Sequence, residues 1–421
     1  MRGIILLGLV ALSCLTSVAD GPVVGQELVS DREPKTGLTL EECASLAMSN
    51  HPGLFEASAR IDESRGAVAQ ARLYPNPRID SGNPQTIGPK KTGVYTIGLT
   101  QEIVRGGKLK LDQAAAYEAS RQSEWDSVRK RFEILTDVRQ QFFSLVAAQR
   151  RLTLLEAQQK LAQRSETIVT DLFDGGQVAR ADMLSLRVER RRSDVALQSA
   201  RFEVIRFRRQ LAATIGSPDL KIEAVKGNLK AEVPAFDDDQ ILAKVIQDSP
   251  FVQIANLDVS RTMYLLRRAE VEPIPNVTIQ GGTQYSESTN NFQGLVGVYV
   301  NVPIWNKNQG NIHSASAAVR RASATRQVVE LELTKQLVIA VSNFREAEKT
   351  VANYEEEIIG DATESLTAIQ AGYAGGQFDL SRLIQAQKSY FETNLEFVSA
   401  LEKRLLSYAE IAGLLQLEQF P

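Results

Sequence analysis

Residues that commonly carry catalysis and metal binding are scarce in this sequence. Its 421 residues include two cysteines, two histidines and four methionines. The histidines, His51 and His313, are far apart, and neither belongs to an HExxH motif or to a pair at metal-ligand spacing. We therefore predict no catalytic residue, no bound metal and no cofactor, and we expect that the protein is not an enzyme.

Cysteine is limited to Cys14 and Cys43. The first follows a short apolar run, Ile4–Leu12, that comes after a basic residue and before the small residues Ser17-Val18-Ala19. This pattern predicts a signal peptide over residues 1–19, cleaved after Ala19, and hence export from the cytoplasm. Lipidation of Cys14 is the alternative. Cleavage leaves one cysteine, so we expect no intramolecular disulfide.

Long apolar runs and basic blocks are also missing. No later stretch reaches the roughly 18 apolar residues of a transmembrane helix. If the mature chain spans a membrane, it must therefore do so as strands closed into a barrel. The net charge is −3, and the arginine-rich run at 187–192 is interrupted by Glu189. We interpret this run as a solvated helix face and expect no nucleic-acid partner.

Glycine and proline, which break helices, are absent from Lys108–Asp174. About 67 residues of uninterrupted helix would extend on the order of 100 Å, far more than a globular core needs. Positions at alternating spacings of four and three predict a coiled-coil seam. Its apolar members are Ile134, Val138, Leu145, Ala148, Leu152 and Leu155, and Gln141 takes the remaining position. A second apolar line follows another face: Phe132, Leu135, Phe142 and Val146. Two seams indicate a neighbouring helix on each side.

Strand-like alternation occurs in two places. Tyr95, Ile97 and Leu99 alternate with Thr96, Gly98 and Thr100. The same period returns at Val277–Gln280 and at Val296–Val302. Each place predicts strands with one apolar and one polar face, two strands in each half of the chain.

The two halves repeat one plan. Pro250 follows Pro52 by 198 residues, and Gly375-Gly376-Gln377 follows Gly175-Gly176-Gln177 by 200. A second long helix is expected over Asn311–Ala371. We predict six segments: a signal peptide (1–19), an N-terminal linker (20–38), a first repeat of helix, two strands, long helix and helix (39–216), a linker (217–239), a second repeat (240–416) and a tail (417–421).

This arrangement predicts a mainly α fold with a β-barrel part. Four strands are too few to close a membrane barrel, which needs about eight. Three chains would supply twelve strands and would leave no open sheet edge in lipid. We therefore expect a homotrimer in which long coiled-coil helices form an α-barrel and the strands form a twelve-stranded outer-membrane β-barrel.

Several phrases resemble the TolC-type outer membrane efflux family over almost the whole mature length. They are His51-Pro52, Ala71-Arg72-Leu73-Tyr74-Pro75-Asn76-Pro77, Gln101-Glu102-Ile103, Gly106-Gly107-Lys108, Val302-Pro303-Ile304-Trp305 and Ala371-Gly372-Tyr373-Ala374-Gly375-Gly376. Within that family the chain is most similar to the CzcC and CusC group of heavy-metal efflux outlets. The resemblance implies a passive trimeric channel in the outer membrane of a Gram-negative-type cell, in contact with outer-membrane lipid, with its helical part in the periplasm.

The same resemblance implies two protein partners, a periplasmic adaptor protein and an inner-membrane efflux pump. Docking is expected at the tip turns, Gly175, Gly176 and Gln177 with Gly375, Gly376 and Gln377. Tyr373 and Asp182 occupy positions where a closed channel would have an inter-helix hydrogen bond, worth about 1.5–3 kcal/mol when shielded. Alternatively, Asp182 is a first-turn carboxylate favoured by the helix dipole.

The expected selectivity ring differs from the family pattern. Positions that carry axial aspartates in relatives hold Arg382 and Gln385 here, so an acidic ring would need another residue, such as Asp379.

Three alternatives in function stay open. The same architecture could export drugs or proteins, or the chain could be a soluble periplasmic coiled-coil adaptor or structural protein. A phosphate-binding loop at Gly106-Gly107-Lys108 is disfavoured, because Leu109 replaces the Ser/Thr. We interpret this phrase as a strand-to-helix turn.

Overall fold

The computed structural model describes residues 37–82, 93–234 and 237–420. The predicted signal peptide, Cys14 and most of the N-terminal linker lie outside these residues. The elements follow in this order: α2 (Leu40–Asn50), α3 (Pro52–Ala71), β1 (Arg78–Gly82), β2 (Val94–Ile103), α4 (Lys108–Asp174), α5 (Arg180–Thr214), α6 (Asp238–Asp248), α7 (Pro250–Glu270), β3 (Val277–Ser286), β4 (Asn291–Val300), α8 (Gln309–Asn353), the π-helical turn η1 (Tyr354–Ile358), α9 (Ile359–Ala374) and α10 (Leu380–Leu414).

Two compact units divide this chain, and each takes residues from both halves of the sequence. Of the described residues, the tip unit holds 37–44, Val138–Glu232 and Ser342–Tyr408. The strand unit holds Ser45–Asp137, Val233–Val341 and the residues from Ala409 onward. The long helices α4 and α8 contribute to both units, so the units do not correspond to the repeats.

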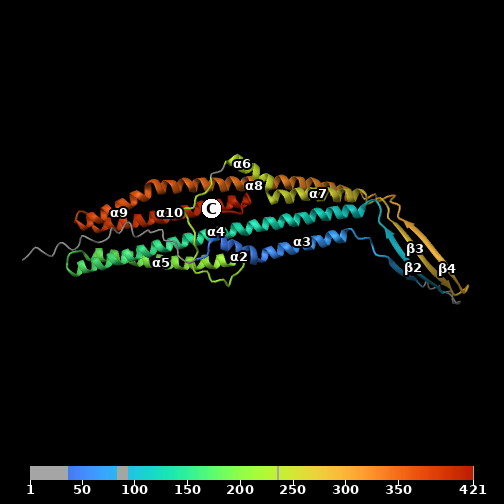
Figure 1. The fold of residues 1–421 in the computed structure, drawn as a ribbon, viewed down its shortest axis with the longest axis horizontal. Coiled ribbons are helices and arrows are strands. Elements are labelled where there is room, and N and C mark those ends of the chain that lie inside the picture. Colours follow the sequence, from blue (N-terminus) through green and yellow to red (C-terminus); the bar gives the residue numbers. More distant parts are fainter. Residues whose placement is uncertain (1–36, 83–92, 235–236, 421) are drawn as a thin grey trace, which may run out of the picture. The chain divides into compact units, whose positions relative to one another are not determined.

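In the strand unit, α3, α4, α7 and α8 each begin or end beside the sheet (Figure 1). The helices contact one another through polar side chains. Ser64 Oγ of α3 donates to Ser120 Oγ of α4 at 3.0 Å. Arg268 Nε of α7 donates to Asp112 Oδ2 of α4 at 3.0 Å.

Equivalent prolines, 198 residues apart in the sequence, begin α3 and α7. Pro52 and Pro250 each occupy the first turn, where the missing N–H costs no helical hydrogen bond. The preceding residue caps the helix in each case. His51 Nδ1 accepts a hydrogen bond from the Gly53 N–H at 3.0 Å, and Ser249 Oγ accepts one from the Phe251 N–H at 3.3 Å.

The sheet is antiparallel, with strand order β1-β2-β3-β4. The central pair, β2 and β3, joins the two halves of the chain over ten residue pairs, from Val94 opposite Ser286 to Ile103 opposite Val277. The two strands predicted in each half are therefore present, and all four belong to one continuous sheet.

In the tip unit, α4, α5, α9 and α10 run side by side (Figure 1). Val138, Leu145 and Ala148 of the predicted seam are buried, as are Phe142 and Val146 of the second apolar line. The prediction is wrong in detail beyond residue 150, where Leu152 and Leu155 are only half-buried and Leu154 is buried instead. Because α4 packs against helices on more than one side, its apolar face is broader than a single seam.

The predicted linker 217–239 is fastened to the tip unit over its described part. Gln149 of α4 pairs with the backbone of Val225: its Nε2 donates to the Val225 carbonyl at 3.1 Å, and its Oε1 accepts from the Val225 N–H at 3.1 Å. Arg404 of α10 donates to the carbonyls of Leu229 and Ala231 at 3.2 and 3.1 Å. From residue 217 to residue 234 the segment has no helix or strand, but its backbone is anchored to two helices; α6 begins at Asp238, inside the predicted linker.

The second long helix differs from the expected single rod over Asn311–Ala371. It begins at Gln309 and is divided by the π-helical turn at Tyr354–Ile358. A π turn adds one residue to the helical repeat and redirects the side chains around it. Here the Tyr354 hydroxyl donates to Glu396 Oε2 of α10 at 2.8 Å, and Glu355 forms an ion pair with Lys230 of the linker at 3.2 Å.

Candidate functional site

One surface of the sheet is apolar and exposed. The strand register places alternate residues of all four strands on the same face. Large apolar members of this face are Ile79, Tyr95, Ile97, Leu99, Ile103, Val277, Ile279, Tyr285, Phe292, Val296, Val298 and Val300. Ile97 is 59% exposed and Val296 is 84% exposed. A contiguous apolar surface of this size is typical of contact with lipid or with another protein.

Aromatic residues mark both ends of this apolar face. At one end Tyr285 contacts Tyr95 and Phe292, with ring centroids 6.4 and 4.9 Å apart. Beyond the other end, Ile304 and Trp305 follow β4, and Trp305 is 87% exposed. Ten residues of strand extend about 33 Å, enough to cross the roughly 25 Å apolar band of an outer-membrane barrel when tilted. Aromatic belts at both boundaries are typical of such barrels.

The opposite face of the sheet is mainly polar and includes glycines. Thr96, Thr100 and Glu102 of β2 belong to it, together with Gln280 of β3, which accepts a hydrogen bond from the Tyr299 hydroxyl at 3.0 Å. Gly98 and Gly282 lie directly opposite each other on this face. A Cβ atom on Gly282 would lie 2.4 Å from the Ile97 carbonyl oxygen, so no larger residue fits there.

A polar cavity of about 780 Å³ lies where the sheet meets the helices of the strand unit. Lys108, 4% exposed, donates to Asn276 Oδ1 at 3.2 Å and forms an ion pair with Glu272 at 3.5 Å. Asn276 in turn donates to Glu102 Oε1 at 2.7 Å. The strand residues of this cavity, Glu102, Thr278 and Tyr299, belong to the polar face.

The charges in this cavity balance one another. Burial by itself would raise the pKa of the Glu272 carboxyl, but the hydrogen bond and charge of Arg268 and the charge of Lys108 outweigh it and hold this pKa below its ordinary value. Two carboxylates therefore face two cations. This arrangement fixes the strand-to-helix connection, as predicted for Gly106-Gly107-Lys108, whose glycines have φ of +71° and +70°.

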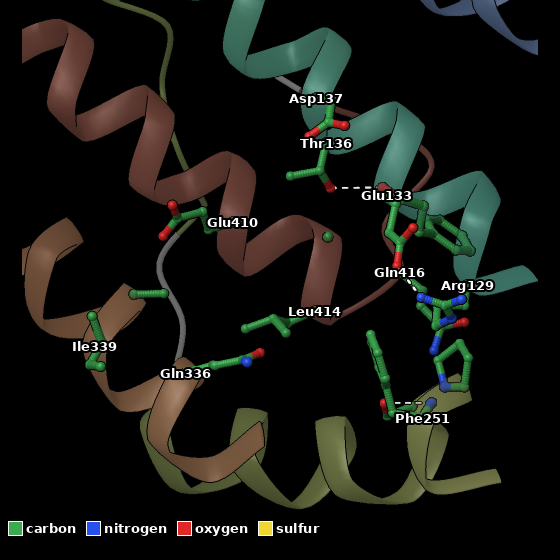
Figure 2. Close-up of a pocket in the computed structure, with 15 residues that line it drawn as sticks. Arg129, Glu133, Thr136, Asp137, Phe251, Gln336, Ile339, Glu410, Leu414 and Gln416 are labelled. Carbon is green, nitrogen blue, oxygen red and sulfur yellow. Dashed lines mark hydrogen bonds and ion pairs between the residues drawn. The ribbon is translucent and has the colours of Figure 1, made fainter. Parts of the chain in front are cut away.

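A second cavity, of about 570 Å³, lies between α4, α7, α8 and the C-terminal end of α10 (Figure 2). Its walls are mostly apolar, including Phe132, Ile339 and Leu414. Arg129 at its edge donates to Asp126 and Glu133 and lies over the Phe251 ring at 5.5 Å. The Arg129 guanidinium is thus hydrogen-bonded to carboxylates of its own helix. Among the described residues, no group of three or more His, Cys, Asp or Glu side chains could hold a metal ion.

The predicted tip turns have the same geometry in both halves. Gly176 and Gly376 have φ of +72° and +74°, in the left-handed region that glycine tolerates. The N–H of Gln177 donates to the Leu172 carbonyl at 2.9 Å, and that of Gln377 donates to the Gly372 carbonyl at 2.8 Å. Both glycine pairs are exposed.

The candidate gate residues are only partly brought together. Asp379 caps α10, because its Oδ1 accepts a hydrogen bond from the Arg382 N–H at 2.9 Å. The Arg382 guanidinium lies over the Phe378 ring at 4.5 Å, and Phe378 contacts Gly372 closely. Gln385 is exposed.

Tyr373 and Asp182 are both half-buried, and no hydrogen bond joins them within the described chain. Sequence reasoning missed Phe378. The glycine at 372 was the available signal, since a Cβ there would lie 2.4 Å from the Phe378 ring.

The sequence model for the outer membrane efflux protein family matches the chain twice, at residues 43–217 and 241–415. The chain belongs to this family. This outer membrane efflux protein therefore combines a membrane-facing sheet with periplasmic helices, and it is a transport protein of the outer membrane. The two matches are 198 residues apart, the same offset that separates Pro52 from Pro250. Among the helices that the structure describes, none contains an apolar stretch sufficient to span a lipid bilayer.

Curated relatives and a solved structure agree with this assignment. The efflux protein is 25% identical to the cobalt-zinc-cadmium resistance protein CzcC of Cupriavidus metallidurans, over 89% of this chain and 88% of the relative. It is 24% identical to the nickel-cobalt-cadmium resistance protein NccC of Alcaligenes xylosoxydans xylosoxydans, over 72% and 69%. The crystal structure of CusC has the same fold, with a TM-score of 0.78 at 15% identity, covering 92% of this chain and 95% of CusC.

Proposed function

We propose that three copies of this protein form the outlet channel of a tripartite efflux system, and that the channel passively conducts heavy-metal cations out of the cell. The observation that carries the channel is the two-faced sheet. Each chain offers four strands with one lipid-compatible face and one polar face, and twelve strands from three chains would enclose a polar lumen. An inner-membrane pump supplies the energy, and the channel performs no catalysis.

Heavy-metal cations are the proposed cargo because CzcC and NccC are named for resistance to cobalt, zinc, cadmium and nickel. Deleting the gene should increase sensitivity to these metals, and the intact gene should restore resistance. Sensitivity to apolar drugs should not change. Increased sensitivity to drugs alone would contradict the metal cargo and favour the drug-export alternative.

The channel itself is tested with purified protein. Extraction from the membrane should need detergent, and reconstitution into planar bilayers should give stable conductance. A protein that leaves the membrane under mild washing, as a water-soluble monomer without conductance, would contradict the channel and favour a soluble periplasmic protein.

A periplasmic adaptor is proposed to dock on the tip turns, where Gly175, Gly176 and Gln177 and their counterparts Gly375, Gly376 and Gln377 are exposed. Exposed backbone at a narrow turn permits close approach by a partner helix. A photo-crosslinker at Gln177 or Gln377 should capture the adaptor in cells. The same crosslinker at Tyr117, an exposed residue of the strand unit, should not.

We further propose that Tyr373 and Asp182 form a latch in the closed channel, since both belong to the tip unit and both are half-buried next to a tip turn. Tyr373→Phe combined with Asp182→Ala should raise resting conductance in planar bilayers, because a charge-assisted bond would be lost. Tyr117→Phe, the same substitution at an exposed residue of the strand unit, should leave conductance unchanged and serves as the comparison. Unchanged conductance in the double variant would exclude the latch.

A further inference from the structure

Helix α5 has an apolar stripe that its own chain leaves uncovered. Leu184, Val188, Val195 and Phe202 follow spacings of four, seven and seven, so they share one face of the helix. All four are exposed, Val195 and Phe202 to 65% and 64%. The opposite face of α5 is covered, since Leu186, Leu197 and Val204 are buried. One seam of α5 is thus completed within the chain and the other is open.

Arginines accompany the open seam. Arg191 takes the seam position between Val188 and Val195, and Arg192 is next to it. Both are exposed, and neither has an ion pair among the described residues. By contrast, Arg187 and Arg190, on the side of the helix nearer α4, both pair with Glu166 of that helix.

An acidic stripe with complementary charge lies on η1 and α9. Glu357, Asp361 and Glu364 are spaced by four and three residues, and all three are exposed. None has an ion pair within the described chain, whereas Glu355 of the same turn is paired with Lys230. Three like charges on one helix face repel one another unless cations come close.

The two stripes lie at the same height above the tip turns. Leu380 and Ile384 of α10 pack on Met183 of α5, so both tip turns are at one end of the tip unit. Arg191 lies 11 residues after the start of α5 at Arg180. Glu364 and Asp361 lie 10 and 13 residues before the end of α9 at Ala374. At about 1.5 Å per residue, each charge is on the order of 15–20 Å from the tip.

Other helices separate the stripes within one chain. Arg151 of α4 forms an ion pair with Glu402 of α10, and Leu366 of α9 packs on Tyr390 of α10. Helices α4 and α10 therefore lie between α5 and α9 (Figure 1). The two stripes occupy the two lateral edges of the tip unit, where a second copy can bring them together.

We propose that the open seam of α5 is covered by the η1–α9 edge of a second copy of this chain, with Arg191 and Arg192 facing Asp361 and Glu364. The contact is head-to-tail, so it closes only in a ring. This inference rests on the proposed trimer and adds which helices meet and which charges set their register. The matched height of opposite charges favours a second copy over an adaptor helix as the occupant.

Disulfide trapping tests the contact in the full-length protein. Arg191→Cys combined with Glu364→Cys, oxidised in outer membranes, should give covalent dimers and trimers on non-reducing gels. Native Cys43 does not interfere, because burial raises the pKa of its thiol to about 12. Arg201→Cys with Glu364→Cys is the matched control. Arg201 is on α5 but turned toward Glu156 of α4, at 3.9 Å, and should give no ladder.

The outcomes separate this inference from the proposed function. Native gels without a trimer would overturn both. If native gels show a trimer but oxidation gives no covalent dimers or trimers, only the α5–α9 contact is overturned. The same holds if the thiol introduced at position 191 becomes linked to an adaptor.

Charge reversal provides a second measurement. Arg191→Glu with Arg192→Glu should lower the temperature at which trimers dissociate in detergent, and adding Asp361→Arg with Glu364→Arg should restore it. Arg201→Glu should change it little. No shift in the first variant would contradict charge pairing at this edge.

Discussion

At the scale of single residues, glycines allow the backbones of two neighbouring strands to approach closely. Gly98 and Gly282 face each other across β2 and β3 on the polar side of the sheet. A Cβ on Gly282 would approach the Ile97 oxygen to 2.4 Å and the Gly98 Cα to 2.7 Å. These neighbours are backbone atoms in a paired strand, so they have little freedom to move away.

Gly282→Ala should therefore disrupt the pairing of β2 with β3. We expect a loss of about 1–3 kcal/mol in the free energy of unfolding, the usual cost of overpacking. Its neighbour is the control, since nothing lies within 4 Å of a Cβ on Gly281. The measurement is the melting temperature of each variant in detergent. Equal melting temperatures for Gly282→Ala and Gly281→Ala would show that the close approach is not a constraint.

Some of these single-residue features can be predicted from the sequence, and others cannot. Tyr95, Ile97 and Leu99 alternate with polar residues and small glycine, so period-two reasoning predicts both the strand and its faces. The turn glycines at 176 and 376 are likewise predicted, because the phrase Gly-Gly-Gln recurs 200 residues apart, each time at the end of a long helical pattern. The stacking of Arg382 on Phe378 and the capping by Asp379 depend on how the chain reverses at the tip, which the sequence pattern leaves open.

At the scale of elements, the linker is the main departure from the prediction. A charged segment with prolines at 218 and 234 predicts an irregular connection, and its described part up to residue 234 has no helix or strand. Its attachment could not be predicted, because Gln149 and Arg404 bind backbone atoms rather than side chains. Backbone groups are the same at every residue, so the sequence does not indicate where these bonds form.

Gln149→Leu should release the linker at Val225. Two hydrogen bonds are lost, and the backbone groups of a fully buried residue are left without this partner, at a cost of about 1–3 kcal/mol. We expect faster tryptic cleavage after Lys226. Gln163→Leu, at an exposed position of the same helix, should leave cleavage unchanged. Equal cleavage rates in both variants would contradict this role of Gln149.

At the scale of the whole molecule, the sheet defines the environment of the protein. Its apolar face would be unstable in water, and its four strands cannot close alone. Family membership, the aromatic ends and the polar opposite face are consistent with one arrangement, in which the apolar face meets lipid. Fold class and duplication were both predictable from sequence, because they depend on period and repetition rather than on individual contacts.

A cation on the lipid-facing side should prevent stable insertion. Ile97→Lys should cost about 2–4 kcal/mol per chain, the value for a lysine near the middle of the bilayer. Thr96→Lys, one residue away on the polar face, should be tolerated. Heat-modifiable trimers in outer-membrane fractions provide the measurement. Similar yields from the two variants would contradict the assignment of the faces.

The π-helical turn distinguishes the long helices of the two halves. α4 continues for 67 residues as an unbroken α-helix, while its counterpart is interrupted at Tyr354–Ile358. Helices bend preferentially at π turns, so we expect bending of the second half to concentrate at Tyr354–Ile358. The two long helices of the repeat would then respond differently to a bending force, and the contacts of Glu355 with Lys230 and of Tyr354 with Glu396 would limit the bend at the π turn.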